Sequence, residues 1–519
     1  MTPSLLARLD ARRTSDRHAA AVMSTDGRIL SVNDFSSRIR TIARGFAAAG
    51  LKSGERVLFA VRPDIDAIIL MLGIAEAGGV LVPVDTNMGP ALFESRMKSI
   101  SPSWVVAESI LYSLSASRWI RSLLSRRGIN LPRLGAVRNA RFVHVGRSWP
   151  GVPAGKSAMA IEMLGLNSRE STAIDDGDNA AVMMVFTSGT SGEPKAVVHT
   201  RRSMRGVFDT IDPLLDAHGG DCVYSGELHL ILPALFAGAS VVIPCRTRFS
   251  AKRVLADMER FRVTHFFEVS AEFQQLVDGV AALKKTLPET LRQIWIGAAP
   301  VRATLLRNCK LVLAKSTRVW CVYGMTEVLP VARVSLDEKV QYDGAGDLVG
   351  PCVDGVVARI SEDGELLLRG PNLCSGYFGE SPLQELATGD LARFDDGRIV
   401  LLGRRKDMII RGQFNIYPEL YESTIEGIAG VTRCAMVGFY DEAAADEKVL
   451  LVIQPVENTH VAAFEERLWR ELQSGPNSID PAALPDTIVF MTLPMCGRSS
   501  KVDKQRLREF AMQLPCASQ

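Results

Sequence analysis

A run of small hydroxyl residues and glycines, closed by a lysine, stands near the middle of the chain and directly after a hydrophobic segment. Its members are Thr187, Ser188, Gly189, Thr190, Ser191, Gly192, Glu193, Pro194 and Lys195. The backbone N–H groups of such a run are open to phosphate oxygens, and the terminal lysine adds a positive charge. A Walker loop needs adjacent glycine and lysine, whereas Pro194 precedes Lys195 here. The run therefore predicts a phosphate-binding loop of another type.

Further blocks that combine glycine with polar or charged residues follow along the chain. They read Gly297-Ala298-Ala299-Pro300, Tyr323-Gly324-Met325-Thr326-Glu327, Thr388-Gly389-Asp390, Gly403-Arg404-Arg405-Lys406-Asp407 and Ser500-Lys501-Val502-Asp503-Lys504. Taken alone, Asp390 or Glu327 would be interpreted as a solvated carboxylate and Lys501 as a surface lysine. Their succession between residues 187 and 504 makes coincidence negligible.

With these blocks the sequence resembles the adenylate-forming superfamily of acyl-CoA synthetases, luciferases and nonribosomal adenylation domains, over essentially the whole chain. The resemblance implies that residues 187–195 hold the phosphates of ATP and that residues 297–300 flank the adenine. It implies further that Tyr323 stacks on adenine, that Thr326 meets the α-phosphate and that Glu327 helps to hold Mg²⁺.

The same resemblance gives roles to the later blocks. Asp390 would accept hydrogen bonds from both ribose hydroxyls, and Arg404 would contact the ribose. Lys406 would be the pivot of a hinge, and Lys501 would be the adenylation lysine. In the family the C-terminal domain then rotates about this hinge, withdraws the lysine and presents another face for thioester formation.

The chemistry of adenylation agrees with these residue types. The carboxylate of an acid attacks the α-phosphate of ATP, so two anions meet and the growing charge must be neutralised. Lys501, Lys195 and Mg²⁺ at Glu327 would do so, and no protein nucleophile is needed because the acid is already ionised near pH 7. We therefore expect ATP- and Mg²⁺-dependent activation of a fatty, aryl or hydroxy acid, with pyrophosphate release and transfer to the thiol of CoA or of a carrier protein's phosphopantetheine.

One departure from the family pattern concerns the acceptor. The segment after the hinge usually reads GGxNIxP, but here Gln413 replaces its second glycine. A glutamine adds bulk where a pantetheine arm would pass close to the backbone. Either the side chain swings aside, or the enzyme resembles β-lactone synthetases, which adenylate a β-hydroxy acid and need no CoA. A non-catalytic nucleotide binder is the remaining alternative, and the intact Lys195 and Asp390 argue against it.

The acyl pocket is less well defined by sequence. Amino-acid-activating members carry an aspartate near the position of Ser225, so an α-amino acid is disfavoured. We expect Tyr224, Ser225, His229 and Val322 to line the pocket. His229 is interpreted as a lining or core residue rather than a proton-transfer group.

Length and periodicity predict the architecture. A chain of 519 residues is expected to form two or three domains. Short apolar runs alternate with helical segments from about residue 55, which is typical of βαβ units in an α/β fold. We predict a large N-terminal domain over 1–405, with mixed sheets flanked by helices plus a β-rich subdomain. A smaller, mobile α+β C-terminal domain over 406–519 would carry the adenylation lysine.

Composition limits partners and compartment. The net charge of +2 gives no field that would attract nucleic acid, and the nine scattered cysteines favour reduced thiols in a cytoplasm. No segment offers the roughly 20 clean apolar residues of a bilayer span. Between Glu108 and Glu162, however, the sequence holds no acid but many arginines over residues 118–147. That stretch is either a solvated surface helix or a docking patch for an acidic acyl carrier protein or an anionic membrane surface.

Overall fold

The computed structural model describes Leu9 and residues 20–84, 90–125, 131–147, 149–153, 158–161, 177–187, 195–245, 249–411, 414–441, 446–457, 459–474, 476–496 and 501–513. Within these residues, two sheets of eight strands form the body of the protein, and a five-stranded sheet follows them. Among the described helices, none is long and apolar enough to cross a bilayer.

The first sheet has the order β15-β14-β13-β12-β10-β11-β1-β2. Its strands β10 to β14 run parallel, and β15 and β2 pair antiparallel at the two edges. Helices cover both faces. The strands are β1 (Ala20–Ser24), β2 (Ile29–Ser31), β10 (Cys222–Tyr224), β11 (Ser240–Ile243), β12 (His265–Val269), β13 (Gln293–Gly297), β14 (Arg318–Met325) and β15 (Val328–Ser335).

The second sheet has the order β19-β9-β8-β4-β3-β5-β6-β7. Its strands β3 to β6 alternate with helices and run parallel, as the apolar alternation from residue 55 predicts. The strands are β3 (Arg56–Ala60), β4 (Val80–Pro83), β5 (Trp104–Glu108), β6 (Arg141–Val145), β7 (Ala158–Ala160), β8 (Ala181–Thr187), β9 (Lys195–Thr200) and β19 (Gly376–Tyr377).

Helices between and outside these sheets bury the apolar faces of the strands. One core cluster joins α2, α3, α8 and α9 to the first sheet, and α3 also packs on the second. A further cluster places α10, α11 and α12 on the opposite face of the first sheet. The helices are α2 (Val32–Ala48), α3 (Ile65–Glu76), α4 (Pro90–Ile100), α5 (Ser109–Ala116), α6 (Arg118–Ser125), α8 (Arg201–Leu215), α9 (Leu228–Ala237), α10 (Ala251–Phe261), α11 (Ser270–Ala282), α12 (Ala303–Lys310) and α13 (Leu336–Gln341).

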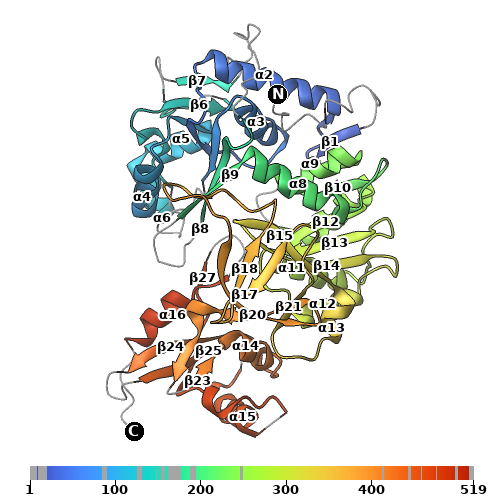
Figure 1. The fold of residues 1–519 in the computed structure, drawn as a ribbon, viewed down its shortest axis with the longest axis vertical. Coiled ribbons are helices and arrows are strands. Elements are labelled where there is room, and N and C mark those ends of the chain that lie inside the picture. Colours follow the sequence, from blue (N-terminus) through green and yellow to red (C-terminus); the bar gives the residue numbers. More distant parts are fainter. Residues whose placement is uncertain are drawn as a thin grey trace.

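The β-rich unit expected after residue 340 is an antiparallel sheet of order β16-β21-β20-β18-β17. Figure 1 shows it between the large sheets and the C-terminal region. Arg404 ends β21 and pairs with Asp390 of β20, so both residues lie close to the start of the C-terminal region. The strands are β16 (Asp347–Gly350), β17 (Val357–Ile360), β18 (Glu365–Arg369), β20 (Leu386–Asp395) and β21 (Arg398–Arg404).

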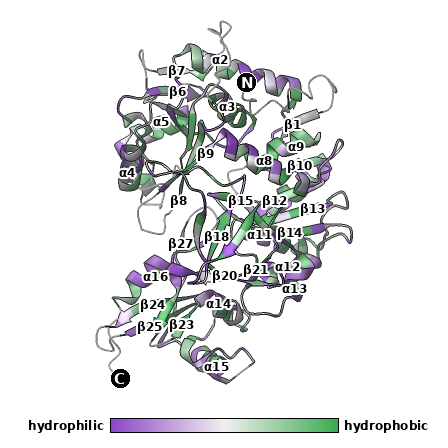
Figure 2. Ribbon diagram, in the orientation of Figure 1, coloured by the Kyte–Doolittle hydropathy of each residue, from purple (hydrophilic) through white to green (hydrophobic). Residues whose placement is uncertain are grey.

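The C-terminal region is a smaller α+β unit with its own core (Figure 1). Strands β24, β25 and β26 form its sheet. Figure 2 shows the hydrophobic colour on β25 and the hydrophilic colour on much of helix α16. Its elements are β22 (Ile409–Arg411), β23 (Phe414–Ile416), α14 (Pro418–Glu426), β24 (Val431–Asp441), β25 (Asp446–Pro455), α15 (Val461–Ser474), β26 (Thr487–Phe490), β27 (Met495–Cys496), β28 (Lys501–Val502) and α16 (Lys504–Ala511).

Candidate active site

A buried carboxylate connects several of the predicted site residues. The Tyr323 hydroxyl donates to Asp390 Oδ2 at 2.5 Å, and Arg404 Nε lies 2.5 Å from Asp390 Oδ1. Asp390 is only 4% exposed. The structure therefore brings together residues from three sequence blocks around one carboxylate.

Local backbone structure holds this carboxylate in place. Strands β20 and β21 pair Asp390 directly with Arg404. Gly389 adopts a φ of +73°, a left-handed conformation that favours glycine, and its N–H donates to Glu365 Oε1 at 2.7 Å. The Asp390 N–H donates to Thr388 Oγ1 at 3.0 Å. The Thr-Gly-Asp block is thus a tight, hydrogen-bonded bend that directs one carboxylate into the site.

The pKa of the Asp390 carboxyl is raised above its ordinary value. Burial raises the pKa of its carboxyl, whereas Arg404, the Tyr323 hydroxyl and Lys501 oppose that rise. Burial of an acid disfavours its ionised form, and nearby cations and donors favour it. A carboxylate with two held oxygens and a cationic partner is suited to accept hydrogen bonds from the vicinal hydroxyls of a ribose.

Lys501 reaches this cluster from the C-terminal region. It lies on β28, paired with Cys496 of β27. Burial lowers the pKa of its ammonium, Arg404 lowers it further and Asp390 opposes the change. Since Arg404 and Asp390 both act on its pKa, the exposed Lys501 lies within electrostatic range of the cluster, and no ion pair joins them among the described contacts.

An ion pair joins the C-terminal region to the N-terminal part, and α16 contacts the segment of the predicted hinge. Arg302, which precedes α12, pairs with Glu426 of α14. Arg508 of α16 donates to the Lys406 carbonyl at 3.0 Å and to Asp407 at 2.6 Å. The side chain of Lys406 is exposed, and its backbone lies in the short 3-10 turn that follows β21. The predicted hinge is therefore clamped by α16 in the present arrangement.

The loop after β13 approaches the neighbouring strand closely. A Cβ on Gly297 would lie 2.9 Å from the Val322 carbonyl oxygen, so a larger residue does not fit without movement. Ala298 has a φ of +63°, which strains a residue other than glycine. Ser270 Oγ donates to the Ala299 carbonyl at 3.1 Å and fixes the loop. Together with Pro300, these residues lie at the carboxyl end of a parallel strand, where α/β proteins bind ligands.

Lys195 and Thr187 flank the predicted phosphate loop. Strands β8 and β9 are antiparallel and pair Thr187 with Lys195. The residues predicted between them, Ser188, Gly189, Thr190, Ser191 and Gly192, lie outside the described residues, as does Gln413.

Glu327 fits the requirements of a magnesium ligand. The Tyr377 hydroxyl donates to its Oε1 at 3.2 Å, and among the described residues no donor contacts Oε2. The backbone around it is fixed, since His199 Nε2 contacts the Thr326 carbonyl at 2.8 Å and the Cys374 N–H donates to the Glu327 carbonyl at 2.8 Å. No group of three metal-ligating side chains occurs in the described part of the chain. Since Mg²⁺ commonly binds one or two carboxylates, waters and substrate phosphates, a single glutamate with a free oxygen fits.

The predicted acyl-pocket residues are not all brought together. His229 meets Phe267 edge to face at 6.0 Å, and Val322 packs in the same cluster as Phe267. Ser225 precedes His229 in the chain and is buried, and its hydroxyl accepts a hydrogen bond from the Glu227 N–H. Tyr224 belongs to the core on the opposite face of the sheet, where its hydroxyl donates to Asp257 at 3.3 Å. Burial lowers the pKa of His229, so its imidazole is neutral at pH 7.

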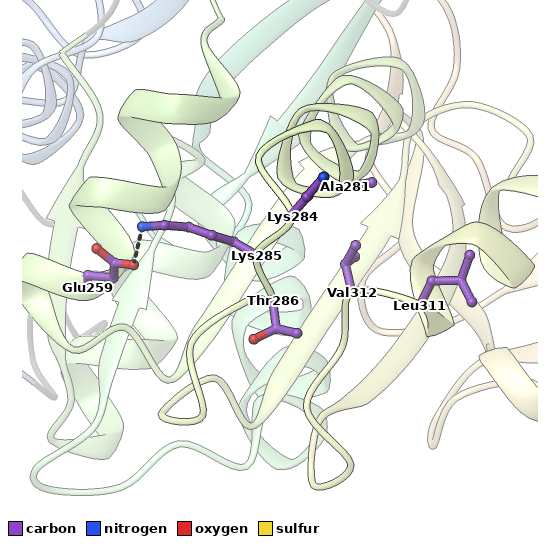
Figure 3. Close-up of a pocket in the computed structure, with 7 residues that line it drawn as sticks. All are labelled: Glu259, Ala281, Lys284, Lys285, Thr286, Leu311 and Val312. Atoms are coloured by element: carbon purple, nitrogen blue, oxygen red, sulfur yellow. Dashed lines mark ion pairs between the residues drawn. The ribbon is translucent and has the colours of Figure 1, made fainter.

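A separate surface pocket lies away from these residues (Figure 3). Its lining comes from the segments that follow α11 and α12, and Lys285 pairs with Glu259 at 3.5 Å on its wall. These segments precede β13 and β14, so the pocket lies at the amino ends of the strands. Gly297 and Tyr323 lie toward the carboxyl ends, and the pocket is therefore not the site.

The structure adds residues that sequence blocks did not single out. Tyr377 contacts Glu327, Glu365 caps the bend at Gly389, and Glu419 of α14 faces the end of β21. The only sequence signal for Tyr377 is its place in a Gly-Tyr pair between two turns. No local signal distinguishes Glu419 from other surface acids, because its environment arises from contact with the N-terminal part.

Glu419 makes this contact sensitive to pH. Burial raises the pKa of its carboxyl to about 7, Glu422 and Asp390 raise it as well, and Lys504 and Arg404 oppose them. Between about pH 4.5 and pH 7 the folded protein keeps a proton that the unfolded chain has lost. This contribution to stability is present below pH 4.5 and is lost as pH rises through 7.

Replacement of Glu419 by glutamine should remove this pH dependence. We expect Glu419→Gln to be more stable than wild type at pH 8, by up to about 3 kcal/mol, and equal to it at pH 4.5. Chemical unfolding at both pH values measures the difference. Glu466→Gln, at an exposed position on α15, is the matched control. If the free energies of unfolding of Glu419→Gln and wild type differed by the same amount at both pH values, the raised pKa of Glu419 would be wrong.

Known proteins resemble this chain in sequence and in fold. A feruloyl-CoA synthase of Amycolatopsis is 26% identical over 98% of this chain and 97% of that protein. An olefin beta-lactone synthetase of Stenotrophomonas maltophilia is 26% identical over 93% of this chain and 91% of that protein. The ATP-bound structure of MatB from Rhodopseudomonas palustris superposes with a TM-score of 0.78 at 22% identity, covering 99% of each chain, which is a likeness of fold.

The fold and the site together define an adenylate-forming ligase, with a large N-terminal and a smaller C-terminal domain as the sequence predicts. The chain belongs to the AMP-binding enzyme family, whose sequence model matches residues 8–378. The resemblance deduced from the sequence blocks is thus confirmed. The roles of individual residues stay predictions.

Proposed function

We propose that this enzyme joins a carboxylic acid to ATP with Mg²⁺ and releases pyrophosphate, and that it then passes the acyl group to the thiol of CoA. The observation that carries the proposal is the cluster of Asp390, Tyr323 and Arg404 facing Lys501. It supports Asp390 as an acceptor for the ribose and Tyr323 as a platform for the adenine, with Lys501 of the C-terminal region as the nearby cation. Such an arrangement supports attack of one anion on another by charge neutralisation.

The domain boundary belongs to the same proposal. We place the N-terminal domain at 1–405 and the mobile C-terminal domain at 406–519, with Lys406 as pivot. The pair between Arg302 and Glu426 joins the two domains and would have to open for rotation, whereas Arg508, Lys406 and Asp407 all lie in the C-terminal domain. Since the Arg302–Glu426 contact is a single ion pair, its opening is compatible with a transition between half-reactions.

Two acceptors are supported by different relatives. The feruloyl-CoA synthase favours CoA, and the olefin beta-lactone synthetase favours an intramolecular hydroxyl. A carrier protein's phosphopantetheine presents the same thiol as CoA and is the third acceptor. We propose CoA, with β-lactone formation as the alternative that a bulky Gln413 would favour.

The size of the acid is restricted by an aromatic row. The first sheet places Phe267, Trp295 and Trp320 side by side on β12, β13 and β14, on the face that also holds Val322. Trp295 is only 4% exposed. A long acyl chain along this face would have to displace this packed tryptophan. The row therefore supports a compact aryl or short hydroxy acid rather than a long-chain acid.

Pyrophosphate release with a panel of acids tests the proposal. The panel contains aryl, short hydroxy, long-chain and amino acids, each with ATP and Mg²⁺, with and without CoA. We expect release with compact acids and acceleration by CoA with formation of a thioester. Release that CoA does not change, with a β-lactone as product, would establish the alternative. Absence of both release and ATP binding would contradict the family function.

A surface near α6 supports a peripheral membrane contact. Trp119 is 75% exposed, and Leu123 is exposed as well. Burial lowers the pKa of Arg121, and repulsion from Arg133 and Arg118 lowers it further. Exposed tryptophan beside arginines that form no ion pair with the described residues is suited to an anionic lipid surface. We expect co-sedimentation with phosphatidylglycerol vesicles but not with pure phosphatidylcholine.

The vesicle experiment has a matched pair of variants. Trp119→Ala should reduce co-sedimentation, whereas Leu311→Ala, at a 79% exposed position distant in sequence, should not. Equal binding by both variants, or no binding by wild type, would exclude this surface as a membrane contact. Binding of an acidic carrier protein in place of vesicles would identify the other kind of partner.

A further inference from the structure

Tyr377 lies between two charged residues with proposed roles in catalysis. Its hydroxyl donates to Glu327 Oε1 at 3.2 Å, and the Lys195 ammonium lies 4.6 Å from the centre of its ring. Lys195 and Glu327 form no ion pair with one another among the described contacts, and Lys195 pairs instead with the more exposed Glu380 at 3.1 Å. One half-buried aromatic side chain thus contacts both groups while they remain apart.

The backbone fixes Tyr377 in this position from two sides. Strand β19 pairs Tyr377 with Val197 on β9, the strand that begins at Lys195. The Phe378 N–H donates to the Ala196 carbonyl at 2.8 Å. On the other side, the Cys374 N–H donates to the Glu327 carbonyl at 2.8 Å. The segment around Tyr377 is therefore anchored both to the strand of the lysine and to the strand connection that carries the glutamate.

We propose that Tyr377 is a positioning residue that keeps Lys195 available to the phosphates of ATP and Glu327 available to Mg²⁺. This inference rests on the proposed function. Opposite charges at short range in a partly desolvated site attract strongly, and a direct pair would occupy both groups. The ring face attracts the ammonium by a cation–π contact, and the hydroxyl holds one carboxylate oxygen. Oε2 then stays free for the metal.

Two variants separate the ring from the hydroxyl. Tyr377→Phe keeps the ring face for Lys195 and removes the donor to Glu327, whereas Tyr377→Leu removes both. Calorimetric titration with ATP, in the presence of Mg²⁺ and in the presence of a chelator, measures binding independently of turnover. Tyr342→Phe is the matched control, because its hydroxyl bonds to Arg393 in another part of the protein.

The expected results differ between the two variants. For Tyr377→Phe, we expect the gain in ATP affinity on adding Mg²⁺ to fall by about tenfold, and ATP affinity without Mg²⁺ to stay unchanged. For Tyr377→Leu, affinity without Mg²⁺ should fall as well, because Lys195 loses its aromatic partner and is free to pair with Glu327. If Tyr377→Trp has the ATP affinity of wild type without Mg²⁺ but not the full gain on adding Mg²⁺, the ring has the proposed role.

Several outcomes would overturn the inference. If both variants gained as much ATP affinity on adding Mg²⁺ as wild type does, Tyr377 would position neither group. Equal losses with and without Mg²⁺ in Tyr377→Phe, together with a lowered melting temperature, would show a packing role only. If wild type itself bound no ATP and released no pyrophosphate with any acid, the proposed function would fail instead. The wild-type titration therefore distinguishes the two failures.

Discussion

Replacing Lys501 by alanine is expected to slow formation of the acyl-adenylate by about 10²–10³-fold, the loss typical when one preorganised charge-stabilising group is removed. Lys501 lies within electrostatic range of Asp390 and Arg404, since both act on the pKa of its ammonium. Its ammonium would neutralise charge that develops between the acid and the α-phosphate. ATP-dependent pyrophosphate exchange, measured at saturating acid, reports this half-reaction directly.

The lysine prediction has a control on the same segment. Arg506→Ala removes a positive charge from exposed α16, five residues further along, and should leave the exchange rate unchanged. ATP affinity should change much less than the rate in Lys501→Ala, because the lysine acts on charge that grows in the transition state. An unchanged exchange rate in Lys501→Ala would refute its assignment as the adenylation lysine.

Replacing Asp390 by asparagine is expected to weaken ATP binding by about 1.5–3 kcal/mol, or roughly 10- to 150-fold, because a charged acceptor of ribose hydroxyls is lost. The carboxylate already accepts from Tyr323 and pairs with Arg404. Its position therefore does not depend on the nucleotide. Calorimetric titration with ATP measures the loss, and titration with 2′-deoxy-ATP tests its origin.

The deoxynucleotide distinguishes a ribose contact from a structural role. Wild type should bind ATP more tightly than 2′-deoxy-ATP, and the Asp390→Asn variant should discriminate less. Asp395→Asn, at the surface end of the same strand β20, serves as the control. A loss that is equal for both nucleotides would indicate that Asp390 mainly holds Arg404 and Tyr323 in place.

Much of the site was predictable because nucleotide contacts depend on short backbone segments. The Gly297–Pro300 loop needs glycine where a Cβ would meet the Val322 carbonyl, and the Thr388–Asp390 bend needs glycine at a positive φ. Such requirements act within a few residues, so they leave a readable pattern. The alternation of strands and helices is equally local, since it follows from burial of one face of each element.

The acyl pocket was less predictable because it depends on which face of a strand a side chain occupies. Tyr224 and Phe267 lie in neighbouring strands, yet Tyr224 packs against α10 and Phe267 against His229. A shift of one residue in a strand exchanges the two faces. Sequence spacing near a motif cannot give that register over the distance from residue 224 to residue 267.

The sequence by itself determined the class of chemistry, because the hydroxyl, glycine, carboxylate and lysine blocks each need particular residue types at fixed local spacing. Only the tertiary structure decided how those blocks combine. Lys501 comes within electrostatic range of Asp390, Tyr377 lies between Lys195 and Glu327, and burial raises the pKa of Glu419 to about 7. These relations depend on distance and desolvation between segments far apart in the chain, and no local pattern encodes either quantity.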